Sequence, residues 1–152
     1  MNKHQLMKSR RDFVKTSALL GAGLALAPNM AFGMSNTSKE KLNVALIGVG
    51  LRGTNHLSNL LQRNDIHISA ICDIDAKRID ICLDLLKKAG QISPKTYGKD
   101  TLDYRNLLED ASIDAVIIST PWLWHTRMAK DAMLAGKYTG VEVSAANTIE
   151  EC

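Results

Sequence analysis

Short apolar runs alternate with amphipathic stretches along the chain from residue 41 onward. The runs have the length and composition of buried parallel strands, whereas the stretches between them repeat apolar residues at helical spacing. Strands are predicted at Leu42–Ile47, His67–Cys72, Thr96–Tyr97, Asp114–Ser119 and Tyr138–Val143. Helices are predicted at about Arg52–Arg63, Ala76–Ala89, Asp103–Glu109 and His125–Ala135. The alternation predicts an α/β fold, a doubly wound parallel sheet.

The turn after the first predicted strand has the pattern G-x-G-x-x-G, with Gly48, Gly50 and Gly53 at the glycine positions. In a strand–turn–helix unit the first glycine allows the tight turn and the second lets backbone N–H groups approach a pyrophosphate. The third lets the helix pack close to its strand. The positive end of the helix dipole then faces the phosphates. This context predicts a dinucleotide site, and a merely structural turn is the alternative.

An acidic residue follows the second predicted strand, at the spacing that a dinucleotide site needs. Asp73 lies 20 residues after Gly53, where its carboxylate would accept both ribose hydroxyl protons of NAD. Its charge would repel a 2′-phosphate, so NAD rather than NADP is the expected cofactor.

Two further segments, Thr120–His125 and Gly140–Ser144, follow the fourth and fifth predicted strands. Ligands of doubly wound sheets bind outside the carboxyl ends of the strands, so both segments are expected to border the cofactor. The first holds both tryptophans of the chain, and a hydrophobic plug in which His125 starts a helix is the alternative. Glu142 is expected to hydrogen-bond a ribose, a nicotinamide amide or a substrate hydroxyl, unless it is a solvated charge at a strand end.

Residues 1–33 have the pattern of an export signal. Arg10 and Arg11 form a twin-arginine signature, and the apolar run Ala18–Ala27 is shorter than the ~20 residues that span a bilayer. We expect export to the periplasm by the twin-arginine machinery, with no stable membrane span. An uncleaved basic amphipathic helix is the alternative. Residues 34–40 are then a flexible lead-in, and residues 41–152 are the nucleotide-binding domain.

Setting the leader aside changes the charge of the chain. The whole chain has 19 Lys and Arg residues and 16 Asp and Glu residues, which give a net charge of +3. Five of the basic residues and one of the acidic residues lie in residues 1–33. The rest therefore carries −1, and no basic patch suggests nucleic acid. Cys72, Cys82 and Cys152 form no C-x-x-C pair or Cys/His cluster, so the sequence indicates neither a zinc site nor a redox pair.

The last residues, Thr148–Glu151, have the form of a capping box, with Thr at the N-cap and Glu three residues later. A capping box predicts a helix, and one residue follows it. We therefore expect the chain to be the front part of a longer protein. Its nucleotide-binding domain would be truncated at the C-terminal end, and its second, substrate-binding domain would be missing.

Four motifs together resemble those of the Gfo/Idh/MocA oxidoreductase family, the relatives of glucose–fructose oxidoreductase and inositol dehydrogenase. They are Ile47–Gly53 (IGVGLRG), Cys72–Asp75 (CDID), Thr120–His125 (TPWLWH) and Gly136–Ser144 (GKYTGVEVS). More narrowly, Lys41–Cys152 is similar to glycoside hydrolase family 109, the NAD-dependent α-N-acetylgalactosaminidases. GLRG, W-x-W-H and G-x-E-V are motifs of that narrower group, in which a twin-arginine leader is also usual.

The resemblance implies roles for particular residues. Leu51 and Arg52 would line the cofactor pyrophosphate, and Asp73 would hold the adenosine ribose. Glu142 and Val143 would flank the nicotinamide half. The loop that would pack along the cofactor consists of Trp122, Leu123, Trp124 and His125. No catalytic residue is assigned in this chain, because the acid and base residues of the family lie in the second domain.

One departure from the broader family bears on the reaction. Its dehydrogenases carry Glu-Lys-Pro where this chain has Glu142-Val143-Ser144, so the lysine that would assist hydroxyl deprotonation is absent. This argues against ordinary sugar dehydrogenation, whereas the Glu-Val form fits the glycosidase group.

The resemblance implies hydrolysis of a terminal sugar through a transient oxidation. NAD⁺ would take a hydride from C3, the ketone would acidify the C2 hydrogen, and elimination would expel the C1 substituent. Water would then add, and NADH would return the hydride. The paired carboxylates of most glycosidases are not required on this route. Two functions stay open beside it: a net sugar or cyclitol oxidoreductase, and a non-catalytic nucleotide-binding module. The chain alone is expected to bind NAD weakly and to turn over nothing.

Overall fold

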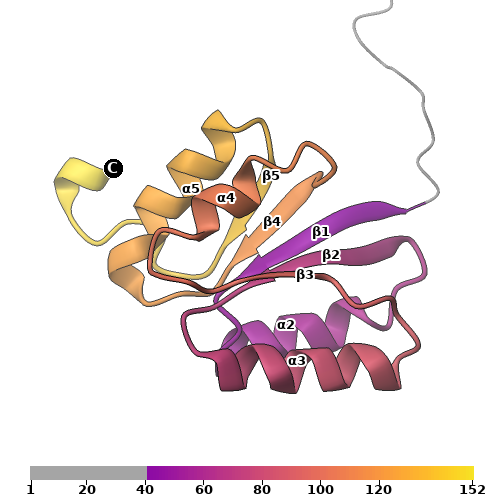
Figure 1. The fold of residues 1–152 in the computed structure, drawn as a ribbon. Coiled ribbons are helices and arrows are strands. Elements are labelled where there is room, and N and C mark those ends of the chain that lie inside the picture. The colour runs from indigo at the N-terminus through magenta and orange to yellow at the C-terminus, as the bar shows by residue number, and fades with distance from the viewer. Residues whose placement is uncertain (1–40) are drawn as a thin grey trace, which may run out of the picture. The chain divides into compact units, whose positions relative to one another are not determined.

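A computed structural model describes residues 41–152, and it confirms the predicted alternation of strands and helices (Figure 1). The strands are β1 (Leu42–Ile47), β2 (Ile66–Cys72), β3 (Lys95–Tyr97), β4 (Ala115–Ile118) and β5 (Tyr138–Val141). The helices are α2 (Leu51–Leu60), α3 (Ala76–Lys88), α4 (Tyr104–Leu108) and α5 (His125–Leu134), with single 3₁₀ turns η1 (Trp122–Trp124) and η2 (Ile149–Glu151). The predicted export signal and lead-in lie outside the described residues.

The five strands form one parallel sheet in the order β3-β2-β1-β4-β5. Helices α2 and α3 cover one face of the sheet, and α4 and α5 cover the other (Figure 1). The predicted doubly wound fold is therefore confirmed. The direction of winding reverses between the neighbouring strands β1 and β4, and in folds of this kind ligands bind beyond the carboxyl ends of the strands at that point.

Each face of the sheet buries its own apolar cluster, and a bulge in β2 decides which β2 side chains join which cluster. Val44 pairs with Ile68 and Ala45 with Ala70, so Ser69 has no register partner on β1, although its hydroxyl donates to the Val44 carbonyl oxygen at 3.5 Å. Ile68 therefore belongs to the cluster under α2 and α3, whereas Ala70 belongs to the cluster under α4 and α5. The first cluster includes Val44, Leu46, Leu57, Cys82 and Leu86. The second includes Ala45, Ile47, Tyr104, Leu107, Met128 and Ala132.

The capping box predicted at Thr148 does not form. Thr148 is the N-cap of η2, but its side chain accepts no capping hydrogen bond. The N–H of Glu151 instead donates to the backbone carbonyl of Thr148 at 3.2 Å, which closes a 3₁₀ turn. The Glu151 carboxylate accepts the N–H of Asn147 at 2.6 Å rather than that of Thr148. The predicted helix is therefore a single turn in the described chain.

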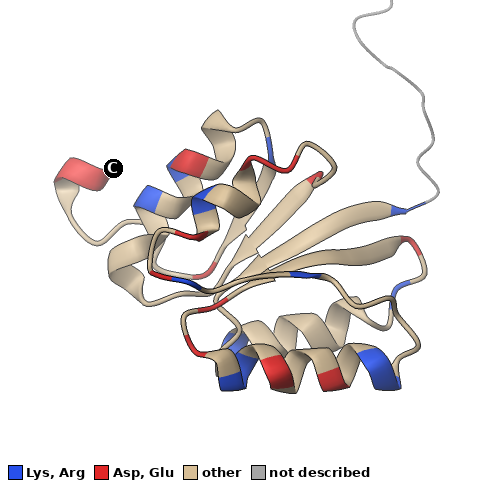
Figure 2. Cartoon of the chain, in the orientation of Figure 1, with Lys and Arg blue, Asp and Glu red and all other residues tan. Residues whose placement is uncertain are grey.

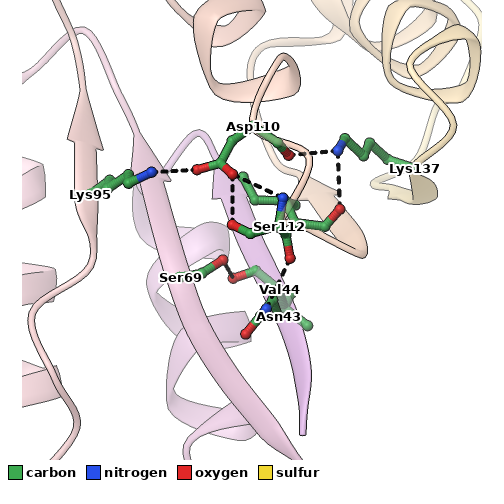
Figure 3. Close-up of polar contacts among 8 residues, drawn as sticks. Asn43, Val44, Ser69, Lys95, Asp110, Ser112 and Lys137 are labelled. Carbon is green, nitrogen blue, oxygen red and sulfur yellow. Dashed lines mark hydrogen bonds and ion pairs between the residues drawn. The ribbon is translucent and has the colours of Figure 1, made fainter. Parts of the chain in front are cut away.

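The end of the sheet where the strands begin, here called the amino edge, is closed by a network around Asp110 and Lys137 (Figure 3). Lys137 is nearly buried, and its Nζ donates to the carbonyl oxygens of Asp110 at 2.7 Å and Ile113 at 3.1 Å. The Asp110 carboxylate accepts from Lys95 Nζ at 2.7 Å and from the N–H and hydroxyl of Ser112 at 2.9 and 2.6 Å. These bonds, that from Lys95 first, hold the pKa of Asp110 well below its ordinary value. The network fixes the loop before β4 to the starts of β3 and β5.

Charged residues of both signs lie on the helices and in the loops, and the middles of the strands carry none (Figure 2). Along α3, basic residues lie at both ends and acidic residues lie between them. No helix within residues 41–152 is long and apolar enough to cross a membrane.

Candidate functional site

A cavity of about 410 Å³ opens at the other end of the sheet, here called the carboxyl edge. The turn after β1 and the start of α2 line it with Gly48, Gly50, Leu51 and Arg52. The end of β2 and the loop after it add Cys72, Asp73 and Ile74, and the loop after β4 adds Ser119, Thr120 and Pro121. Tyr104, Trp124 and Met128 add an apolar wall. The cavity therefore lies where the winding of the sheet reverses, as the sequence predicts for a ligand site.

The three glycines of the turn meet different surroundings. Gly48 has φ +84°, and a Cβ there would lie 2.8 Å from the backbone of Ser119 and Thr120. A Cβ on Gly53 would lie 2.0 Å from the carbonyl oxygen of Gly48, so this glycine is required for α2 to pack against the turn. A Cβ on Gly50 would meet nothing within 4 Å. Only Gly50 therefore leaves open space beside the N-terminus of α2, and its approach to a pyrophosphate stays a prediction.

Asp73 lies in the cavity wall and also holds the glycine turn in place. Its Oδ2 accepts the N–H of Val49 at 2.7 Å, and its Oδ1 accepts the N–H of Asp75 at 2.9 Å. A carboxylate has about four acceptor positions, so these two bonds leave capacity for the two hydroxyls of a ribose. Ribose binding by Asp73 stays a prediction, and the bond to Val49 is a structural role that the sequence did not indicate.

Ser119 is a residue of the cavity wall that the sequence analysis missed. Its Oγ is buried, and within residues 41–152 it is the one buried side-chain oxygen or nitrogen without a hydrogen-bond partner. Such an atom costs about 1–3 kcal/mol unless a ligand or water satisfies it. Its position directly after β4 was the available signal, because polar residues at strand ends face the ligand in this type of fold. An orphaned hydroxyl, open space at Gly50 and the Asp73 carboxylate together fit a dinucleotide.

The loop after β4 brings one of its two tryptophans to the cavity. Trp124 lines the cavity wall, and the Arg127 guanidinium lies over its ring at 5.5 Å from the centroid. Trp122 and Leu123 are 65% and 79% exposed on η1 and are absent from the wall. The predicted packing of this loop along the cofactor therefore has a structural basis at Trp124 alone.

His125, the first residue of α5, is only 1% exposed and does not line the cavity. Its Nδ1 lies 2.8 Å from the carbonyl oxygen of Ser144, and its Nε2 lies 2.8 Å from that of Thr120. Both ring nitrogens are thus occupied by the protein's own backbone. The ring is placed to hold two segments together rather than to contact a ligand.

Glu142 and Val143 follow β5, and neither lines the cavity. The Oε1 of Glu142 lies 2.6 Å from Nε2 of His56 and 2.9 Å from Nη2 of Arg52. These contacts, that with His56 first, lower the pKa of Glu142, which stays ionised. Val143 is 81% exposed. His56 was missed, although its place four residues after Arg52 on one helix was a usable signal.

Comparisons with known proteins identify the family and agree with the fold. Residues 42–152 match a family model described as an oxidoreductase family with an NAD-binding Rossmann fold, GFO_IDH_MocA. A glycosyl hydrolase family 109 protein from Stenotrophomonas maltophilia (strain K279a) is 40% identical over 144 residues, which cover 93% of this chain and 31% of that protein. An α-N-acetylgalactosaminidase from Shewanella oneidensis is 36% identical over 160 aligned positions, covering 94% of this chain and 35% of that protein.

A solved structure shares the fold. The crystal structure of an NAD binding oxidoreductase from Klebsiella pneumoniae matches with a TM-score of 0.57 at 26% identity, over 73% of this chain and 29% of that one. The chain spans about a third of the length of the curated relatives that it matches.

Proposed function

The chain belongs to the Gfo/Idh/MocA oxidoreductase family, whose common element is an NAD-binding Rossmann fold, and from this we propose that its carboxyl-edge cavity binds NAD. We propose further that the chain is the dinucleotide-binding part of a glycosidase related to the α-N-acetylgalactosaminidases. The observation that carries the first proposal is the cavity at the β1–β4 reversal, with Gly50 open on one side and Asp73 in its wall.

Different groups around the cavity suit different parts of the dinucleotide. The first N–H groups of a helix have no acceptor within the helix, so a phosphate in the open space at Gly50 would gain from these donors of α2 and from the helix dipole. The Asp73 carboxylate offers acceptors for ribose hydroxyls, and the Ser119 hydroxyl offers a donor. Tyr104, Trp124 and Met128 exclude water from the apolar side. Bound NAD would supply a reversible two-electron oxidation of a sugar carbon.

Titration of the chain with NADH tests the binding proposal, because both tryptophans lie in one loop and Trp124 lines the cavity. Bound NADH should accept excitation energy from Trp124. We expect NADPH to bind at least about tenfold more weakly than NADH, since the Asp73 carboxylate repels a 2′-phosphate and leaves a hydrogen bond to a charged group unmade.

Asp73→Ala removes a negative charge from the cavity wall. Its matched control is Asp84→Ala, which removes the same charge from an exposed position on α3. Asp73→Ala should weaken NADH binding about tenfold or more, whereas Asp84→Ala should leave it unchanged. Absence of energy transfer at saturating NADH would remove the binding proposal. Equal losses in the two variants would remove the role given to Asp73.

The glycosidase proposal is supported by the names of the relatives at 36–40% identity and by the absence of a lysine at Val143. Its test uses the product of the gene that encodes this chain, read to its stop codon, with a chromogenic α-N-acetylgalactosaminide and no added NAD. Release of the chromophore, with NAD recovered after denaturation, supports it. Steady NADH formation from a panel of sugars and cyclitols, without release, would make the protein a net oxidoreductase instead.

We also propose export of the protein by the twin-arginine machinery, on the sequence of residues 1–33. A reporter that folds in the cytoplasm, fused after residue 40, should reach the periplasm of a bacterial host. Replacement of Arg10 and Arg11 by Lys should retain it in the cytoplasm. Export that persists in the double variant, or in a host without this machinery, contradicts the proposal.

A further inference from the structure

Two consecutive residues at the start of α5 hold the chain that leaves the sheet after β5. This exit segment is defined here as residues 142–145. The His125 ring contacts the carbonyl oxygen of Ser144 at 2.8 Å, and the Thr126 hydroxyl donates to that of Ala145 at 2.7 Å. Within residues 41–152, Ser144 and Ala145 make no other hydrogen bond. These two side chains therefore make the hydrogen bonds that hold Ser144 and Ala145, whereas Glu142 at the start of the segment is held separately by Ile118, His56 and Arg52.

The same ring reaches the cavity wall through its second nitrogen. Nε2 of His125 lies 2.8 Å from the carbonyl oxygen of Thr120, which is itself a wall residue. The backbone of Thr120 packs closely against Gly48, because a Cβ on Gly48 would lie only 2.8 Å from the Thr120 nitrogen. A continuous path of contacts thus runs from Ser144 through His125 and Thr120 to the glycine turn.

We propose that His125 is a positioning residue of the nucleotide site. Its ring spans the Thr120 and Ser144 carbonyls and so fixes the exit segment and the loop after β4 at one spacing. Loss of the ring removes the contact to the Thr120 carbonyl oxygen and so loosens the wall that faces Gly48, where the Thr120 hydroxyl keeps its contact with Met128 Sδ at 3.5 Å. The statement about the nucleotide rests on the proposed NAD binding, whereas the statement about the spacing rests on the contacts alone.

Two amide variants separate the two contacts. A neutral imidazole has one N–H and one acceptor nitrogen, so it donates to only one of the two carbonyls at a time. The amide of Asn places its NH₂ near the position of Nδ1, and the longer Gln places it near that of Nε2. His125→Asn therefore keeps a donor for Ser144, His125→Gln keeps one for Thr120, and His125→Ala keeps neither.

The experiment uses the whole chain with Trp122→Phe, so that Trp124 in the cavity wall is the sole emitter. Acrylamide quenching without nucleotide reports the exposure of Trp124, NADH titration reports binding, and thermal melting reports folding. The matched control is Lys130→Ala on the exposed side of α5.

We expect His125→Ala to bind NADH about tenfold more weakly, with increased quenching of Trp124, because buried carbonyls lose their partner. Either His125→Asn or His125→Gln should restore affinity to within about threefold of the parent, and Thr126→Val should cost about threefold. Lys130→Ala should match the parent. If His125→Ala does not fold, the Asn, Gln and Thr126→Val variants decide.

Parent-like affinity and quenching in His125→Ala would overturn the inference. Asn and Gln variants that both fold and both bind as weakly as Ala would also overturn it, because the ring would then act by packing alone. If the parent chain does not bind NADH, the proposed function fails and the nucleotide part of the inference fails with it. In that case quenching alone decides whether His125 holds the loop: unchanged quenching rejects it, and increased quenching supports it.

Discussion

The two ends of the parallel sheet differ in how completely the protein satisfies its own polar groups. At the amino edge, Lys137 Nζ donates to two backbone carbonyls, and the Asp110 carboxylate accepts from Lys95 of β3 and from Ser112. At the carboxyl edge, Ser119 Oγ has no partner within residues 41–152, and Gly50 borders open space. The amino edge has little left to offer a ligand, whereas the carboxyl edge keeps hydrogen-bonding capacity and room for one.

The difference predicts that stability and binding can be changed separately. Substitutions at the amino edge should lower the free energy of unfolding without changing nucleotide affinity, because they are remote from the cavity. Substitutions in the cavity wall should do the reverse, except where a wall residue also supports the fold. Substitutions at Gly53, Asp73 and Arg52 give the sharpest tests of whether stability and nucleotide affinity change separately.

The largest effect is expected at Gly53, which does not line the cavity but packs against Gly48 of the turn that does. Gly53→Ala places a Cβ 2.0 Å from the Gly48 carbonyl oxygen, which only a backbone shift can relieve. We expect the free energy of unfolding in urea to fall by about 3 kcal/mol and NADH binding to be lost. The control Gly50→Ala, with nothing within 4 Å, should cost less than about 1 kcal/mol yet still weaken binding. Equal costs for the two would contradict the contacts described.

The next effect is expected at Lys137, on the amino edge. Lys137→Met keeps most of the side-chain volume and leaves the carbonyls of Asp110 and Ile113 without their donor. Urea unfolding should show a loss of roughly 1–3 kcal/mol, while NADH affinity stays at the parent value. Lys130→Met on α5 is the control for removal of a positive charge. A drop in affinity that exceeds the drop in stability would break the separation of the two edges.

Acid should weaken both edges, through Asp110 and Glu142. The pKa of each carboxyl is lowered in the folded protein, from ordinary values of 3.8 and 4.5. A lowered pKa stabilises the fold above the unfolded-state value, and that stability is lost as the pH falls through the folded-state value. We expect unfolding free energies measured at successive pH values to fall below about pH 4, and to fall less in Asp110→Asn. An identical profile in the variant would remove Asp110 from the account.

The smallest effect on stability is expected at Arg52. Its guanidinium is mostly exposed and pairs with Glu142 at 2.9 Å, and exposed pairs contribute less than about 1 kcal/mol. Arg52→Met should therefore leave the melting temperature almost unchanged. NADH affinity should fall and lose part of its salt dependence, because Arg52 lines the cavity. A large loss of stability instead would give this pair a structural role like that of the amino-edge network.

Most of the fold could be predicted from local sequence signals. The spacing of apolar residues and the placing of glycine and acidic residues at strand ends can each be recognised within one short stretch of sequence. The glycine turn, Asp73 and the strand–helix alternation all belong to this class. The surroundings of Glu142 did not, because its partners Arg52 and His56 lie 90 and 86 residues away. No periodicity encodes a contact at that separation.

The loop after β4 shows the same limit at shorter range. Its composition indicated a place at the site, but the 3₁₀ turn at Trp122–Trp124 decides that Trp124 faces the cavity while Trp122 faces solvent. The contacts of His125 with two carbonyl oxygens were equally hidden, because backbone acceptors leave no mark in a sequence. The predicted capping box at Thr148 does not form, because the N–H of Glu151 donates to the backbone carbonyl of Thr148 instead of to its hydroxyl.

Ser69 in β2, which has no register partner on β1, has a consequence for how the sequences of relatives align. Strand β2 contains one residue more than its pairing with β1 requires at this point. Val44 and Ala45 are adjacent in β1, whereas their partners Ile68 and Ala70 are separated by Ser69. We therefore expect a homologue without this extra residue to keep the same strand partners and the same carboxylate position at the end of β2. Gaps of one residue in alignments of β2 should therefore gather at Ser69, and insertion or deletion there is the change in length that this strand tolerates best.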